Sequence, residues 1–77
     1  MKKYLAIFEA PCVGSTAEVI YADDPTGADF IAWERSCNDE YIVNGGYDLY
    51  QIVYNHDTHK HELLEITPEM LEEVEEQ

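Results

Sequence analysis

Acidic residues outnumber basic ones by seventeen to four in this chain of 77 residues, which gives a net charge of −13 at pH 7. Carboxylates are almost never fully buried without a partner, so nearly all of them must lie on the surface of a folded state. Charge of one sign also opposes compaction through self-repulsion. The fold must therefore separate one buried apolar side from a strongly acidic exterior.

The length allows a single domain, residues 1–77, and a chain of this size buries only about 60% of its unfolded surface. Apolar residues make up 45% of the chain and include six Tyr, two Phe and one Trp, more than acidic disordered segments carry. We expect a folded domain with little room for an enclosed active site. Fraying is expected only in its acidic C-terminal segment, residues 67–77.

The sequence also bears on the compartment. Two lysines precede an apolar run over residues 4–8, but the run ends at Glu9 and is too short for a secretory signal. No stretch approaches the length of a membrane span. Cys12 and Cys37 are too few for a small secreted domain held by disulfides. We expect a cytoplasmic protein with free thiols, although a single Cys12–Cys37 bridge stays open.

Four segments are rich in β-branched, aromatic and aliphatic residues and are bounded by turn-forming residues, which predicts strands. They are residues 3–9, 18–22, 47–54 and 61–66. The first is apolar with little interruption, so we expect it at the centre of a sheet, covered on both faces. Turns separate the members of each pair, so two hairpins are expected. Asn44-Gly45-Gly46 is the strongest turn signal and precedes the third strand.

A helix is expected between the two hairpins. Either Asp24 or Thr26 can cap its first backbone N–H groups. Phe30, Trp33 and Cys37 recur at helical spacing and form the stripe that we expect to pack on the sheet. The sequence therefore predicts an α+β fold: a small antiparallel sheet of about four strands in the order ββαββ, one helix packed on it, and a short acidic C-terminal helix.

The last helix is expected to run from its cap at Thr67 through Glu76, and it carries a row of carboxylates. Spacings of i, i+3, i+4 and i+7 place them on one stripe: Glu69, Glu72, Glu73 and Glu76. With Glu75, the charge spacing is about 3 Å of axis, close to the roughly 3.4 Å per phosphate of one DNA strand. Like charges at these spacings destabilise a helix, so folding alone does not favour them.

Four further acids, Asp23, Asp24, Asp39 and Glu40, extend the acidic surface with almost no lysine between them. An ordinary soluble surface mixes the two signs. The alternative interpretation of the acidic end is a solubilising tail.

Tyrosines are concentrated in the second hairpin, at Tyr47, Tyr50 and Tyr54. Tyrosine is enriched at interface hot spots, and it is also common at half-buried sheet positions. Both interpretations stay open. The first makes these tyrosines anchors for a protein partner, with the carboxylates steering it.

Three histidines, His56, His59 and His61, lie at or beside the turn of the same hairpin. Two imidazoles and a carboxylate are suitable Zn²⁺ ligands, but the spacing matches no structural zinc pattern, so a solvated polar turn is the preferred interpretation. The thiol of Cys12 has no neighbouring Lys or Arg in the sequence to activate it, and no carboxylate pair is marked out. We expect no enzymatic activity, no catalytic residues and no cofactor.

These features favour an acidic protein that inhibits a basic nucleic-acid-binding protein by occupying its nucleic-acid site. Arg forks bind carboxylate and phosphate in similar ways. Direct binding to nucleic acid or to an anionic membrane is disfavoured by repulsion. In size, charge and mixed α+β character, the chain resembles the acidic DNA mimics that phages and mobile elements direct against restriction or CRISPR machinery. This resemblance of type implies an inhibitor that acts in the cytoplasm, that of the host cell if a phage encodes it, and it assigns no residues.

Two other functions are compatible with the sequence. One is a small interaction or accessory domain that binds a protein through the tyrosine-rich hairpin, or pairs as a homodimer through a strand edge, with acidity serving solubility alone. The other is a metal-binding protein that uses the three histidines.

Overall fold

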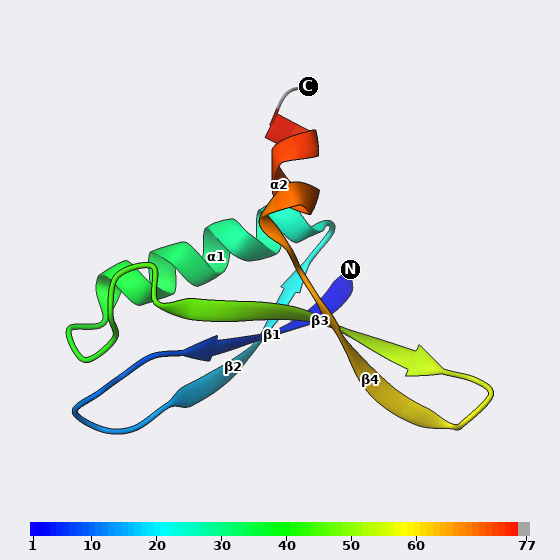
Figure 1. Ribbon diagram of the computed structural model, residues 1–77, viewed down its shortest axis with the longest axis horizontal. Coiled ribbons are helices and arrows are strands. Elements are labelled where there is room, and N and C mark those ends of the chain that lie inside the picture. Colours follow the sequence, from blue (N-terminus) through cyan, green and yellow to red (C-terminus); the bar gives the residue numbers. More distant parts are fainter. Residues whose placement is uncertain (76–77) are drawn as a thin grey trace.

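The computed structural model describes the backbone of residues 1–75 and the side chains of residues 1–71. Its elements, in chain order, are β1 (Lys2–Phe8), β2 (Thr16–Ala22), α1 (Pro25–Asn38), β3 (Tyr47–Asn55), β4 (Lys60–Glu65) and α2 (Pro68–Glu75). The strands form one antiparallel sheet with the spatial order β2-β1-β3-β4 (Figure 1). The α+β class expected from the sequence is confirmed.

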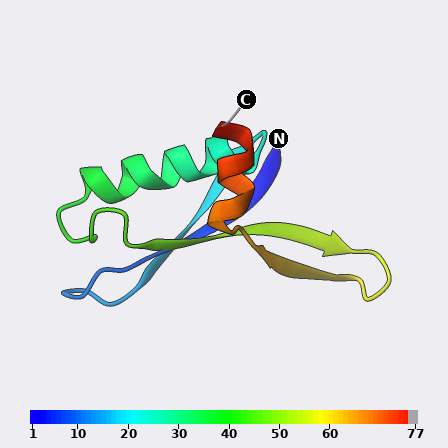
Figure 2. The same ribbon diagram turned by 45° about the horizontal axis from the view of Figure 1, so that its top comes forward.

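Both helices lie on the same side of the sheet, as the two views agree (Figures 1 and 2). Helix α1 runs across the sheet, and α2 stands beside its N-terminal part, which it contacts. In the described part of the chain, no helix covers the opposite side, which we call the open face. The molecule is therefore two layers thick and extends over 40 × 33 × 19 Å.

Strand β1 shows the difference between the two faces. Tyr4, Ala6 and Phe8 are buried under α1, whereas Leu5 and Ile7, which alternate with them, are only half-buried. Side chains alternate along a strand, so Leu5 and Ile7 lie on the open face. The expectation that this strand would be covered on both faces is wrong, because the described chain has no second layer to place on that side.

Asp24 begins helix α1. Its extended backbone (φ −149°, ψ 168°) lets Oδ1 accept a hydrogen bond from the N–H of Gly27 at 2.7 Å, and Pro25 occupies the first turn. Of the two candidate caps, Asp24 therefore has this role. Such a bond satisfies one of the free N–H groups at a helix start.

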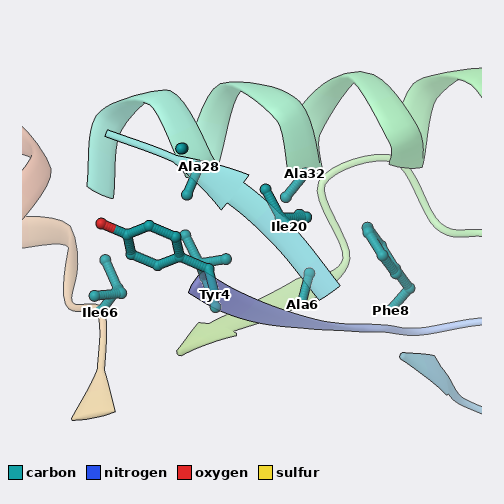
Figure 3. Packing of buried hydrophobic residues seen from close by; sticks show 9 residues of the cluster. Tyr4, Ala6, Phe8, Ile20, Ala28, Ala32 and Ile66 are labelled. Atoms are coloured by element: carbon teal, nitrogen blue, oxygen red, sulfur yellow. The ribbon is translucent and has the colours of Figure 1, made fainter. Parts of the chain in front are cut away.

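The side of α1 that meets the sheet is made of small residues, Ala28, Ala32 and Ser36, all of them buried. Large side chains from the strands fill the space beneath them (Figure 3). The core cluster consists of Tyr4, Ala6, Phe8, Ile20, Ala22, Ala28, Ala32, Leu49 and Ile66. Small residues on the helix allow it to approach the sheet closely while the core stays filled.

The predicted packing stripe of α1 is therefore wrong. Phe30 and Trp33 are 62% and 49% exposed, and Cys37 is also exposed. The physical reason is volume, because the sheet already supplies Tyr4 and Phe8 and leaves room only for small side chains opposite them. The thiols of Cys12 and Cys37 are both free.

Polar contacts tie helix α1 to the start of β3 and to the loop before it. The Tyr47 hydroxyl donates a hydrogen bond to Oδ1 of Asp29 at 2.6 Å. The buried Ser36 hydroxyl accepts from the N–H of Gly45 at 3.0 Å and donates to the carbonyl of Trp33 at 2.8 Å. These bonds fix the loop before β3 against the helix.

One hydroxyl in the core has no such partner. Tyr4 is fully buried, and its OH group meets no hydrogen-bond partner among the described residues. Burial raises the pKa of Tyr4, and the negative charges of Asp24 and Asp23 raise it further. An unpaired buried hydroxyl costs about 1–3 kcal/mol of stability.

Replacing Tyr4 by Phe is therefore expected to leave the free energy of unfolding unchanged or to raise it by up to about 1 kcal/mol. Tyr47→Phe is the matched control, since it deletes the same atom but breaks the bond to Asp29, and we expect it to lower that free energy by about 1–2 kcal/mol. Urea unfolding followed by circular dichroism measures both. Equal destabilisation by the two changes would show that the Tyr4 hydroxyl is bonded after all.

Candidate functional site

Four of the predicted partner-binding acids lie at the two ends of α1. Asp23 and Asp24 precede its first turn, and Asp39 and Glu40 follow its last. All four are exposed. A helix of 14 residues is about 21 Å long, so the two acidic pairs bracket α1 and do not form one cluster. Two of the side chains also stabilise backbone, Asp24 as the cap and Asp39 by accepting from the N–H of Tyr41 at 2.9 Å.

The predicted carboxylate stripe of the last helix is described only in part. Glu69 is exposed in the first turn of α2. The side chains of Glu72 and Glu73 and the whole of Glu76 lie outside the described residues. The structural argument for a binding surface therefore rests on the acids of residues 1–71.

Cations neutralise few of these acids within the protein. In residues 1–71, the one ion pair joins Arg35 of α1 to Glu18 of β2. Lys3 and Lys60 are exposed on the strands, and neither forms an ion pair there. Most carboxylates in this part of the chain are therefore available to cations from outside.

A hollow of about 510 Å³ opens where α1, β3 and the start of α2 meet, and Asp29 of α1 lines it. Tyr47 lines it as well, and its hydroxyl is already bonded to Asp29. Burial, the hydrogen bond to Asp29 and the charge of Asp29 together raise the pKa of Tyr47, so the phenol stays protonated as a donor.

The three predicted tyrosines do not share one face. Tyr47 lies on the covered side, half-buried against α1. Tyr50 and Tyr54 alternate with the buried Leu49 and therefore lie on the open face. Only these two are placed to meet a partner on that face.

The open face is mostly apolar. Cross-strand pairing places Leu5 between Val19 and Tyr50, and it places Leu63 opposite Ile52. Its apolar members are Leu5, Ile7, Ala17, Val19, Tyr21, Tyr50, Ile52, Tyr54 and Leu63. The sequence analysis did not predict this surface. Its signal was the presence of apolar residues at both odd and even positions of the first and third strands, which makes both faces of these strands apolar. Because the sheet has two apolar faces and the described chain has one long helix, one of these faces is left uncovered.

The histidines gather around Tyr54 at the tip of the β3–β4 hairpin. The ring of Tyr54 meets those of His56 and His61 edge-on, at centroid distances of 4.9 and 5.2 Å. Its hydroxyl lies 3.3 Å from Nδ1 of His59, a residue held at φ +58°. Among the described residues, no group of three or more His, Cys, Asp or Glu side chains is arranged to hold a metal ion. Three imidazoles therefore contact one exposed phenol at this tip.

Comparisons of the chain with protein-family models, curated proteins and solved structures find no match. Within residues 1–75, neither helix combines the length and the apolar character needed to cross a membrane. The assignment of function therefore depends on the surfaces described above.

Trp33 packs on the loop before β3, and this contact can be tested at Gly45. A Cβ atom on Gly45 would lie 2.7 Å from Cζ3 of Trp33, and the residue has φ +74°. Gly14 has a similar φ of +85° but open space around it. Gly14→Ala is expected to cost about 1–2 kcal/mol for the left-handed backbone alone.

Gly45→Ala is expected to cost about 1 kcal/mol more than Gly14→Ala, because it also displaces the indole. Urea unfolding gives the stabilities, and the emission of Trp33, the single tryptophan, should shift to the red only in Gly45→Ala. Equal losses with unchanged emission would contradict the contact.

Proposed function

We propose that this protein is a non-catalytic inhibitor that binds a basic nucleic-acid-binding protein at its nucleic-acid site and excludes the nucleic acid. The observation that carries the proposal is the excess of exposed carboxylates that have no cationic partner within residues 1–71. Arg and Lys side chains that hold phosphates pair equally well with carboxylates. An inhibitor of this kind needs no cofactor.

The dimensions of the molecule support this mode of binding. A site that contacts six to ten phosphates spans roughly 20–34 Å of one DNA strand. The acidic pairs at the ends of α1 are about 21 Å apart, and the longest dimension of the described residues is 40 Å. Carboxylates are thus presented over the length of such a site.

The charge also predicts how the complex forms. A net charge of −13 steers the protein toward a cationic surface and raises the association rate, and salt screens that attraction. The same charge repels nucleic acid itself. We therefore propose a competitive, salt-sensitive inhibitor of the anti-restriction or anti-CRISPR type, acting in the cytoplasm of the cell that contains its target.

The positions of Tyr50 and Tyr54 on the open face favour a second candidate function, a small interaction domain whose acidity serves solubility alone. In that case, the partner need not bind nucleic acid. The two functions differ in one measurable respect, which is whether nucleic acid displaces the partner.

We expect the immobilised protein to capture one basic nucleic-acid-binding protein from a lysate of its source cell or of that cell's host. Rising salt and excess duplex or single-stranded nucleic acid, applied in parallel, should both release it. A partner that salt releases and nucleic acid leaves bound would contradict competition and favour the interaction domain.

With that partner purified, the acids at the ends of α1 can be tested directly. Changing Asp23, Asp24 and Asp39 to Asn and Glu40 to Gln is expected to weaken binding about tenfold at low salt, since each exposed pair contributes about 0.2–1 kcal/mol. Asn is as good a helix cap as Asp, so the fold should persist. Titration calorimetry over a series of salt concentrations gives the affinity.

Charge-matched variants separate position from net charge. Asp23→Asn with Asp24→Asn, or Asp39→Asn with Glu40→Gln, removes two charges beside α1. Asp57→Asn with Glu62→Gln removes two at the β3–β4 hairpin. Equal weakening by all three pairs would show that only the total charge matters.

A further inference from the structure

We propose that the open face is the docking surface for the partner, and that it receives an apolar or aromatic segment flanked by Lys or Arg side chains. This inference takes from the proposed function only the basic character of the partner. The location of the contact follows from the sheet itself.

The open face carries a continuous apolar surface. Tyr21 and Leu63 are 56% and 53% exposed on β2 and β4, and Leu5 and Tyr50 connect them across the central strands. Strands lie about 4.8 Å apart and same-face residues repeat about every 6.7 Å, so the apolar members cover roughly 300 Å² of sheet. Patches of this size on a monomer often mark an interaction site.

Carboxylates border this apolar centre, three of them at the end of the sheet where β1 and β4 finish and β3 begins, and one at the end of β2. Asp48 of β3 and Glu65 of β4 lie on the open face, since Asp48 pairs with Ile7 and Glu65 pairs with Tyr50. Glu9 and Asp23, both exposed, directly follow the ends of β1 and β2. Lys3, opposite Tyr21, is the one Lys or Arg on the open face in the described sheet. The surface is an apolar centre with an acidic rim that is densest at the end formed by β1, β3 and β4.

The charge of the rim and the area of the apolar centre together indicate which kind of partner binds the open face. A stable interface buries about 800 Å² on each partner, which is well beyond the apolar centre, so the rim must contribute. Lys3 is the one Lys or Arg on this face of the described sheet that could pair with the carboxylates of a second copy, so two such faces would bring together an excess of like charges, which is unfavourable. A partner with cations around an apolar centre pairs with both parts of the surface.

The outer side of α1 is the competing apolar surface. Phe30 and Trp33 are exposed there, but they form a ridge along a single helix, and Trp33 is already packed on Gly45. The open face extends over four strands and includes its own carboxylates. Phe30 therefore serves as the matched control in the test.

The test uses ¹⁵N-labelled full-length protein and two synthetic helical peptides as probes. The first peptide has Leu and Phe along one face, flanked by Lys and Arg, and the second keeps every cation but has Ser in place of Leu and Phe. We expect amide shifts on β1 to β4 around the open face. We also expect at least tenfold tighter binding of the first peptide.

Variants then locate the contact. Tyr21→Ser with Leu63→Ser is expected to lower the affinity for the first peptide at least tenfold, whereas Phe30→Ser should leave it within twofold. Because all three side chains are about half-exposed or more, the folds should persist, which thermal unfolding checks. Equal binding of both peptides, shifts centred on α1, or an equal loss in Phe30→Ser would overturn the proposal.

Two further results separate the possible occupants and the two proposals. A dimer in sedimentation equilibrium that Tyr21→Ser with Leu63→Ser dissolves would overturn the basic partner in favour of a second copy. With the captured partner, loss of binding in that variant without competition by nucleic acid would retain the docking surface and reject the inhibitor. If nucleic acid competes with the partner but Tyr21→Ser with Leu63→Ser binds the partner unchanged, the inhibitor is retained and the docking surface is rejected.

Discussion

The close contact between the small side chains of α1 and the large ones of the sheet is the constraint on which this structure depends. Ala28 and Ala32 bring the helix near β1, and Tyr4 and Phe8 supply the volume that fills the core. Since a close-packed interior accepts no extra volume, the large residues of the helix must face outward. This contact places the long helix on one side of the sheet, and in the described part of the chain no helix covers the other side.

Charge and apolar area contribute to binding in different ways. Exposed carboxylates act over long range, so they set the rate of encounter and its dependence on salt, but each pair adds little affinity. Burial of aromatic and aliphatic side chains acts only in contact and supplies most of the binding free energy. A protein with both on one surface combines rapid approach to basic targets with discrimination among them.

Local signals in the sequence were sufficient to predict the secondary structure and the α+β class. The turn before β3 and the cap at Asp24 can be recognised from neighbouring residues alone, although Ser36 also holds that turn against α1. The orientation of α1 could not be predicted in this way, because both Phe30 and Ala32 belong to stripes with helical spacing. Which stripe meets the sheet depends on the volumes across the interface, such as that of Tyr4. To predict the open face, the number of layers had to be compared with the number of apolar faces. To predict that Tyr47 and Tyr50 lie on different faces, the strand register was needed.

The pairing of β1 with β3 has a consequence for how the molecule assembles. Each hairpin joins strands that are close in the chain, but the contact of Tyr4 with Gln51 closes a loop that contains the second strand and the whole of α1. Such long-range contacts form late and slow the folding of small domains. That step also brings together two halves of like charge. We therefore expect the encounter of the two hairpins to limit the rate of folding, and counterions that screen their repulsion to accelerate it.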